Sequence, residues 1–311
     1  MEQSIRFDGR TAIVTGAGGN PSLGRAHAML LAARGAAVVV NDIGSDPEMR
    51  HYPGQASAEQ VAEEIRAAGG RAVADTNSVA NVEGAEAIIQ TALDAFGSVD
   101  ILLNNAAISV GAPIDAITPH DFMRHIEVNL MGAVWTCRAA WPHMKAQNYG
   151  RIVNTTSGSM TGFANQTAYA ASKGGLWSFT RSLSAEGGEF GIKANAVNPG
   201  AFTRLVVSNL EEDSPLLQHS KANLPPELAS PAIVYLCHED CPVTGECIDS
   251  VGGAIQRTYM ARTQGYADPD ITIESVARHW DEVMAEEGAE IVGVGDMDTS
   301  EWKIRAYEAN G

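Results

Sequence analysis

Residues 11–42, TAIVTGAGGNPSLGRAHAMLLAARGAAVVVND, place a glycine-rich turn between apolar runs. Residues 11–16 are typical of a buried strand that enters the turn, residues 26–33 of a helix, and residues 36–41 of a second buried strand. Asp42 follows at the carboxyl end of that strand. This order predicts a dinucleotide-binding unit, because glycines let the backbone approach a pyrophosphate and a helix N-terminus offers free N–H groups.

The same alternation of strand and helix continues along most of the chain. Further helices are expected at residues 57–68, 82–96, 118–147 and 167–186, and further strands at 71–75, 100–104, 151–155 and 193–197. Such a pattern predicts an α/β fold with a Rossmann-type, doubly wound parallel sheet. No break in composition marks a linker, so we expect one domain over residues 1–261.

Residues 262–311 form a C-terminal extension beyond the last expected strand. A single helix is predicted over residues 270–287, and it is expected to pack on the same domain or on a neighbouring subunit. One face of that helix would carry Ile273, Val276, Trp280, Val283 and Met284. The long connections at 44–55 and 203–230 are each either a surface loop or a lid over a substrate.

Composition excludes several classes of protein. The net charge of −17 argues against nucleic acid and against anionic membrane surfaces as partners. No apolar run approaches the ~20 residues of a membrane span, and the first residues lack a signal peptide's apolar core, so we expect a cytoplasmic protein. The cysteine spacing fits no zinc finger or ribbon, so buried or free thiols and no metal are expected at Cys137, Cys237, Cys241 and Cys247.

The segment YAASK places Tyr169 and Lys173 four residues apart within the expected helix 167–186. Residues at this spacing share one helix face. A phenol titrates near pH ~10 and is a poor base at neutral pH, but a neighbouring cation favours the phenolate. Ser157 follows the expected strand 151–155, where its hydroxyl can hold a substrate oxygen over the tyrosine. Alone, such a short motif also fits an ordinary surface helix.

Taken together, these segments resemble the short-chain dehydrogenase/reductase family over roughly residues 6–256. The resemblance rests on Thr15, Gly16 and Gly24 of the turn, Asn104-Asn105-Ala106, Asn129, Ser157, Tyr169, Lys173, Pro199-Gly200 and Thr203. Within the family the chain looks most like the dehydrogenase domain of peroxisomal multifunctional β-oxidation enzymes. That likeness is carried by NDIG at Asn41, TALDAFGSVD, VTGE at Val243 and the tail RTQGY. Those domains oxidise (3R)-hydroxyacyl-CoA with NAD.

The resemblance implies a set of site residues. The catalytic group would be Asn129, Ser157, Tyr169 and Lys173. The cofactor would be held by Tyr169 and Lys173 together with Gly16, Asn20, Ser22, Leu23, Gly24, Asp42, Ser78, Val79, Asn105, Ala106, Ala107, Pro199, Gly200 and Thr203.

The acid at position 42 favours NAD over NADP, because a 2′-phosphate would face a carboxylate. Arg25 is the nearest cation that would argue otherwise, and we take it as a helix-start residue. A homodimer or homotetramer is also implied. Its interface would use apolar side chains on helices 118–147 and 167–186, namely Trp135, Trp141, Trp177 and Phe179.

Three departures from the family pattern stand out. The glycine turn is two residues longer than usual, and Ala107 replaces the glycine of NNAG. The interval from Ser157 to Tyr169 is twelve residues instead of thirteen. Thr156 would restore the interval, but Ser157 holds the motif's place after the strand, so a one-residue deletion in the loop is expected.

Three functions therefore remain open. The first is an NAD-dependent oxidoreductase that interconverts a secondary alcohol and a ketone on a 3-hydroxyacyl-CoA. The second is the same chemistry on a free steroid, terpenoid or other alicyclic alcohol. The third, from a different class, is a non-catalytic nucleotide-binding protein.

Overall fold

The structure is a computed structural model that describes residues 4–44, 57–209, 211 and 213–295. Its contacts divide the chain into two compact units, Met1–Arg257 and Thr258–Gly311. The long connection expected at 44–55 lies outside the described residues apart from Gly44, as do residues 296–311 of the extension. Where the extension packs stays a prediction.

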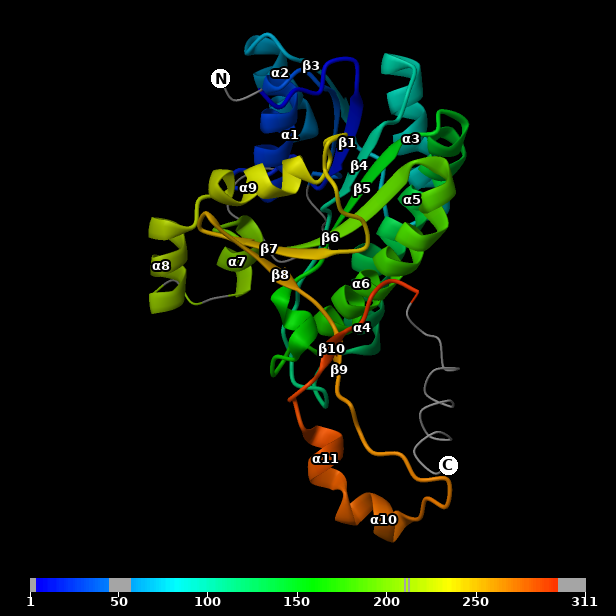
Figure 1. Ribbon diagram of the computed structural model, residues 1–311. Coiled ribbons are helices and arrows are strands. Elements are labelled where there is room, and N and C mark those ends of the chain that lie inside the picture. The colour runs from blue at the N-terminus through cyan, green and yellow to red at the C-terminus, as the bar shows by residue number, and fades with distance from the viewer. Residues whose placement is uncertain (1–3, 45–56, 210, 212, 296–311) are drawn as a thin grey trace. The chain divides into compact units, whose positions relative to one another are not determined.

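An eight-stranded sheet in the order β3-β2-β1-β4-β5-β6-β7-β8 forms the centre of the first unit (Figure 1). Neighbouring strands from β3 to β7 run parallel. The order reverses between β1 and β4, the point where open α/β sheets bind ligands outside their carboxyl ends. The predicted doubly wound parallel sheet is confirmed. Its strands are β1 (Thr11–Thr15), β2 (Ala37–Asn41), β3 (Arg71–Asp75), β4 (Ile101–Asn104), β5 (Gly150–Thr155), β6 (Ile192–Gly200), β7 (Cys247–Val251) and β8 (Ala254–Thr258).

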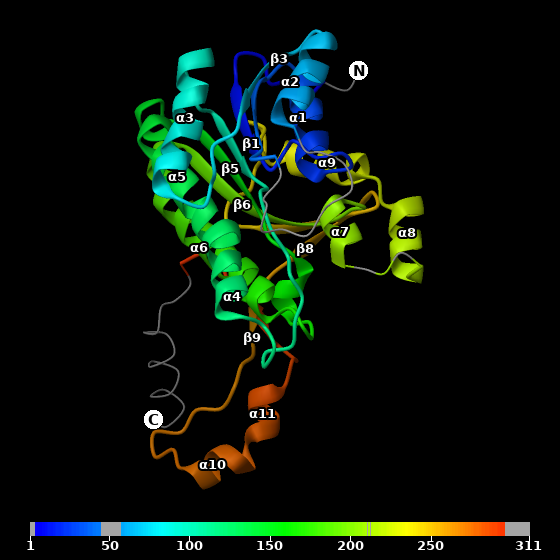
Figure 2. The same ribbon diagram turned by 180° about the vertical axis from the view of Figure 1, so that it is seen from behind.

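Helices cover both faces of this sheet. Figures 1 and 2 show α1, α2 and α9 along one face and α3, α5 and α6 along the other. The helices of the first unit are α1 (Leu23–Ala33), α2 (Ala58–Ala67), α3 (Val82–Phe96), α4 (Pro119–His125), α5 (Gly132–Ala146), α6 (Thr167–Gly187), α7 (Arg204–Asn209), α8 (Pro215–Asn223) and α9 (Pro226–Tyr235).

Two apolar clusters, one on each face, explain why the strands are apolar without a break. Along β1, Val14 belongs to the cluster with α1 and α9, whereas Ile13 belongs to the cluster with α3 and α5. Successive side chains of a strand point to opposite faces, so a strand covered on both sides must be apolar at every position.

The segment predicted as one helix at 118–147 is a continuous helical run with an irregular middle. Thr118 caps its start, because its hydroxyl oxygen accepts the Asp121 N–H at 3.0 Å. Between α4 and α5 the chain makes a π-helical turn, Ile126–Met131, which carries Asn129. Turns of this kind often mark functional sites, and the sequence pattern does not distinguish them from an α-helix.

A two-residue turn joins β7 to β8 and was not anticipated from the sequence. Gly252 and Gly253 have φ of 55° and 86°, the positive values that a tight hairpin of this type requires. The hairpin sets β8 at the edge of the sheet, where Ile255 is 62% exposed.

In the second unit, the prediction of a single helix over 270–287 is wrong. The chain forms two short helices, α10 (Ile273–Arg278) and α11 (Trp280–Met284), and β9 (Ala261–Arg262) pairs antiparallel with β10 (Glu290–Ile291). His279 separates the helices. Its Nδ1 donates to the Ser275 carbonyl oxygen at 2.8 Å, and its ring stacks on that of Tyr266 with the ring centres 3.9 Å apart.

We expect Gly24→Ala to destabilise the first unit. A Cβ there would lie 2.7 Å from Asn105 Nδ2 and 2.8 Å from Ala17 Cα, and closer still to the Gly16 carbonyl oxygen. Overpacking of this kind costs about 1–3 kcal/mol of unfolding free energy, measurable by urea denaturation. Gly188→Ala is the control, since nothing lies within 4 Å of a Cβ at that position. Equal stability of the two variants would contradict the expectation.

Candidate active site

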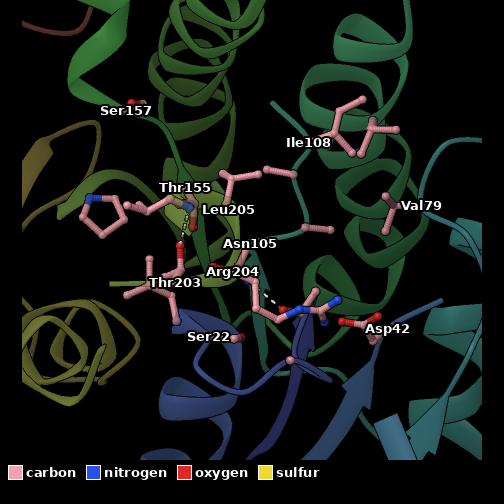
Figure 3. Close-up of a pocket in the computed structure, with 18 of the residues that line it drawn as sticks. Ser22, Asp42, Val79, Asn105, Ile108, Thr155, Ser157, Thr203, Arg204 and Leu205 are labelled. Atoms are coloured by element: carbon pink, nitrogen blue, oxygen red, sulfur yellow. Dashed lines mark hydrogen bonds between the residues drawn. The ribbon is translucent and has the colours of Figure 1, made fainter. Parts of the chain in front are cut away.

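A cavity of about 780 Å³ opens at the carboxyl ends of the parallel strands (Figure 3). Most of the residues predicted for the site line it, and these are Gly16, Ser22, Leu23, Asp42, Ser78, Val79, Asn105, Ala106, Ala107, Ser157, Tyr169, Lys173, Pro199, Gly200 and Thr203. Asn20, Gly24 and Asn129 do not line it. The structure thus brings most of the predicted set together, and the role assigned to each residue stays a prediction.

The Asp42 carboxylate is fixed at the end of β2 by backbone donors. Its two oxygens accept from the N–H groups of Gly18 at 2.9 Å and Gly44 at 2.8 Å. Burial raises the pKa of Asp42, and these two bonds and the charge of Arg204 oppose the rise. The acid is therefore held rigidly, with remaining lone pairs that can accept from ligand hydroxyls.

The turn after β1 gives close backbone access to the cavity. A Cβ at Gly18 would lie 2.8 Å from the Asp42 Cβ, so only glycine fits there without a shift. Ser22 caps α1 by accepting the Arg25 N–H at 3.2 Å. Asn20 is exposed, and Gly24 lies beneath the turn, where α1 packs on it. The two extra residues of the turn therefore do not displace α1 from the cavity.

Hydrogen bonds join the ends of β1 and β4. Thr15 Oγ1 accepts from the N–H groups of Asn105 and Ala106, each at 3.0 Å. In return, Asn105 Nδ2 donates to the carbonyl oxygens of Thr15 at 2.9 Å and Gly16 at 3.1 Å. These bonds hold the floor of the cavity at the switch point of the sheet.

Lys173 is fully buried on α6 and donates through Nζ to the Thr155 carbonyl oxygen at 2.6 Å. Burial lowers its pKa to about 7. Nζ lies 5.6 Å from the centre of the Tyr169 ring. The predicted spacing thus places the amine and the phenol beside each other at the end of β5.

His125 also packs against Tyr169, edge to face, with the two ring centres 6.2 Å apart. Its Nε2 accepts the Val110 N–H at 2.9 Å, so its Nδ1, 2.7 Å from the Asp121 carbonyl oxygen, carries the proton. Burial lowers the pKa of His125. The imidazole is consequently neutral and orients the tyrosine ring without adding charge.

Asn129 lies behind the main cavity and ties α6 to the chain after β4. Its side chain accepts the Ile108 N–H at 2.8 Å and donates to the Ile108 carbonyl oxygen at 3.0 Å and to Ser172 Oγ at 3.2 Å. A second cavity of about 10 Å³, lined by Asn129 and Lys173 among others, lies there. Such a volume holds about one water molecule.

The choice between Ser157 and Thr156 follows from their hydroxyl groups. Thr156 is buried, and its Oγ1 is hydrogen-bonded to Asn198 Oδ1 at 2.6 Å and to the Val197 carbonyl oxygen at 2.8 Å. Ser157 is half-buried, and its oxygen accepts the Ser159 N–H at 3.2 Å. The serine can therefore still donate its hydroxyl hydrogen into the cavity, whereas the threonine hydroxyl is engaged within the sheet.

Two arginines that the sequence pattern did not predict also line the cavity, Arg124 on α4 and Arg204 on α7. Arg25, the cation weighed against NAD specificity, instead pairs with Glu64 of α2 at 2.5 Å and does not line the cavity. The sequence pointed to Arg204 only through its position directly after Thr203, in the connection that follows β6. No sequence feature pointed to Arg124 as a residue of the cavity.

A nicotinamide dinucleotide fits these residues. The turn offers backbone without side chains at Gly16 and Gly19, the start of α1 faces the same space, and Asp42 stands at the far end. The cavity then continues to Ser157 and Tyr169, so one elongated ligand can reach both regions.

Comparison with known proteins agrees with this geometry. The family model "short chain dehydrogenase" matches residues 10–214. The chain belongs to the short chain dehydrogenase family.

None of the helices in the part of the chain that the structure describes has the length and hydropathy of a membrane span.

Relatives of this family member are found both as parts of longer proteins and as single domains. The chain is 38% identical over 288 residues to peroxisomal multifunctional enzyme type 2 of Mus musculus, covering 91% of this chain and 38% of that protein. The full-length type 2 structure from Drosophila melanogaster matches with a TM-score of 0.80 and 33% identity, over 98% of this chain and 50% of that one. A short chain dehydrogenase from Mycobacterium avium matches with a TM-score of 0.73 and 36% identity, over 89% and 95%. The chain thus spans half or less of the length of the two type 2 multifunctional enzymes.

We expect the burial of Lys173 to make stability depend on pH. Its pKa is about 7 in the fold and 10.5 ordinarily, so between these values the unfolded chain holds one more proton and stability rises with pH. Relative to Lys173→Met, the wild type should therefore gain up to about 1.4 kcal/mol of unfolding free energy per pH unit.

Urea denaturation between pH 7.5 and 9.5 measures this gain. Lys221→Met serves as the control, because Lys221 is exposed on α8 and should show no such difference. A difference between wild type and Lys173→Met that stays constant with pH would show that the amine is already charged in the fold.

Proposed function

We propose that the protein is an NAD-dependent oxidoreductase that interconverts a secondary alcohol and a ketone. The observation that carries the proposal is the shared cavity: Ser157, Tyr169 and Lys173 line one part of it and Asp42 another. Family membership supports the same reaction class. A non-catalytic nucleotide-binding protein would not need a buried amine beside a tyrosine in that cavity, so we do not favour that alternative.

The chain's own groups account for the movement of the proton. Tyr169 removes the proton of the alcohol in oxidation and returns it in reduction, while Ser157 donates to the substrate oxygen. Lys173, when protonated, favours the phenolate form of its neighbour. The bound nicotinamide supplies the hydride acceptor or donor.

A path for the proton beyond the lysine is supported by the small cavity beside Asn129. Lys173 lines both this small cavity and the main one. The small cavity has a volume of about 10 Å³, which suits about one water molecule. We propose that Asn129 holds that water in contact with the lysine. Asn129 is therefore a positioning residue, since its side chain is hydrogen-bonded to Ile108 and Ser172.

For the substrate, we propose a 3-hydroxyacyl-CoA, with a free alicyclic alcohol as the second candidate. The likeness to multifunctional β-oxidation enzymes favours the thioester. So does Arg124 on the cavity wall, because cations bind CoA phosphates; its Nη1 is also paired with Glu127 at 3.3 Å. The overall acidic charge of the chain gave no such support from the sequence.

We further propose a cytoplasmic homo-oligomer. The four cysteines are free thiols, as is usual in a reducing compartment. The apolar side chains predicted for an interface are half-buried in the single chain, and these are Trp135, Trp141, Trp177 and Phe179. In the second unit Ile273, Trp280 and Met284 are exposed, so the expectation that the extension packs on the same domain or on a neighbouring subunit also stands as a proposal.

We expect Tyr169→Phe to reduce turnover by about 10²–10⁴-fold, because a general acid–base group contributes that much. Steady-state oxidation rates measure the loss, and NAD binding should be nearly unchanged. Tyr235→Phe is the matched control, since Tyr235 is exposed on α9 and does not line the cavity. Turnover of Tyr169→Phe within a few-fold of wild type would rule out this role for the tyrosine.

Catalytic efficiency should be higher with NAD than with NADP. The Asp42 carboxylate would accept hydrogen bonds from the adenosine ribose hydroxyls and repel a 2′-phosphate. The Asp42→Ala variant should therefore bind NAD more weakly and NADP more tightly, which narrows the preference for NAD over NADP. Asp94→Ala, an exposed acid on α3, is the control. Clear preference of the wild type for NADP would contradict the proposal.

The substrate class is tested by one NAD-coupled screen. (3R)-Hydroxyacyl-CoA thioesters, their (3S) forms and free alicyclic alcohols are compared by catalytic efficiency, with Tyr169→Phe as the blank. We expect the (3R) thioesters to be preferred. Preference for the free alcohols would move the assignment to the second candidate, and no turnover of any secondary alcohol would contradict the proposed reaction.

A further inference from the structure

The Arg204 side chain crosses the glycine turn at the floor of the cavity. A Cβ placed on Gly19 would lie 3.2 Å from Arg204 Cδ and 3.3 Å from Arg204 Nη1. The same Cβ would lie 3.2 Å from the Ser22 Cβ, at the start of α1. The guanidinium is therefore in contact range of bare backbone beside a helix N-terminus. Figure 3 shows it pointing along the turn toward Asp42.

Backbone contacts fix the position of this arginine. Arg204 is the first residue of α7, and its N–H donates to the Pro21 carbonyl oxygen at 3.3 Å. Thr203 precedes it, and its hydroxyl oxygen accepts the Val206 N–H at 3.4 Å. The start of α7 is thus attached to the turn itself, so the side chain reaches the cavity from a defined point.

The cavity concentrates positive charge in an acidic chain. Among the described residues that line it, the charged side chains are Asp42, Arg124, Lys173 and Arg204. That is three basic groups to one acid, whereas the whole sequence has 21 Lys and Arg against 38 Asp and Glu. Lys173 has a pKa of about 7, so the two arginines are the permanent cations. The charge of Arg124 is offset by Glu127, whose Oε2 lies 3.3 Å from its Nη1.

We propose that Arg204 binds the diphosphate of the dinucleotide, an inference that rests on the proposed function. The phosphates of a dinucleotide lie over the glycine turn and the N-terminus of the following helix, and Arg204 crosses that turn at Gly19. A guanidinium presents paired N–H donors that match phosphate oxygens. The backbone N–H groups and Arg204 would then hold the diphosphate from opposite sides.

Two other roles for Arg204 make different predictions. If it bound a 2′-phosphate, it would act at the ribose end of the ligand, where Asp42 is fixed. If it only anchored α7 through its charge near Asp42, its loss would alter the fold and leave phosphate recognition intact. Ligands that carry the diphosphate, the 2′-phosphate or neither separate these cases.

The experiment is calorimetric titration of the full-length protein with ADP-ribose, 2′-AMP and adenosine. Arg204→Gln should weaken ADP-ribose binding by about tenfold or more, the usual effect of losing a charge-assisted hydrogen bond. Its affinity for adenosine should stay within about twofold of wild type, and 2′-AMP, whose phosphate Asp42 repels, should bind both proteins weakly. Arg25→Gln is the matched control, since it removes the same charge close to the turn from a residue paired with Glu64 outside the cavity.

Each other outcome overturns the inference in a distinguishable way. Unchanged ADP-ribose affinity, an equal loss in Arg25→Gln, or a loss confined to 2′-AMP would each refute diphosphate binding by Arg204. Should Arg204→Gln fail to fold, Arg204→Lys preserves the charge but not the paired donors, and undiminished affinity in that variant would refute the inference. If the wild type binds no ADP-ribose at all, the proposed function fails with it.

Discussion

The buried bond from Lys173 Nζ to the Thr155 carbonyl oxygen is the contact on which the site depends. Removing an amine from water costs free energy, and the hydrogen bond of 2.6 Å to the end of β5 offsets part of that cost. It sets the position of α6 along the end of β5. Because Tyr169 is one helical turn before the lysine and Ser157 is two residues after Thr155, a single contact places all three groups in one cavity.

The parallel sheet makes that contact part of a larger arrangement. Strands that run the same way bring their carboxyl ends to one edge, so Gly16, Asp42, Asn105 and Thr155 meet although they are far apart in the chain. The bonds between Thr15 and Asn105 then join the two central strand ends. Reactive side chains are thus supported by backbone groups, which leave little freedom for the floor of the cavity to change.

Features that depend on local pattern could be predicted from the sequence. The strand and helix alternation, the glycine turn, Asp42 and the Tyr169–Lys173 spacing all express periodicity or the chemistry of one short segment. Features that depend on contacts between distant segments could not. The break at His279 is accompanied by stacking on Tyr266, the edge strand β8 comes from a glycine pair within an apparent tail, and Arg204 reaches the first turn only after the sheet has formed.

A cationic cavity within an acidic chain has a consequence for binding kinetics. At a distance the net charge of −17 repels an anionic ligand, whereas inside the cavity Arg204 attracts it. Salt screens exposed charges beyond ~10 Å at 0.1 M but acts less on partly buried ones. The association rate constant of a dinucleotide should therefore rise with ionic strength while its residence time shortens only slightly. Polyanions too large to enter the cavity are only repelled by the net negative charge of the chain.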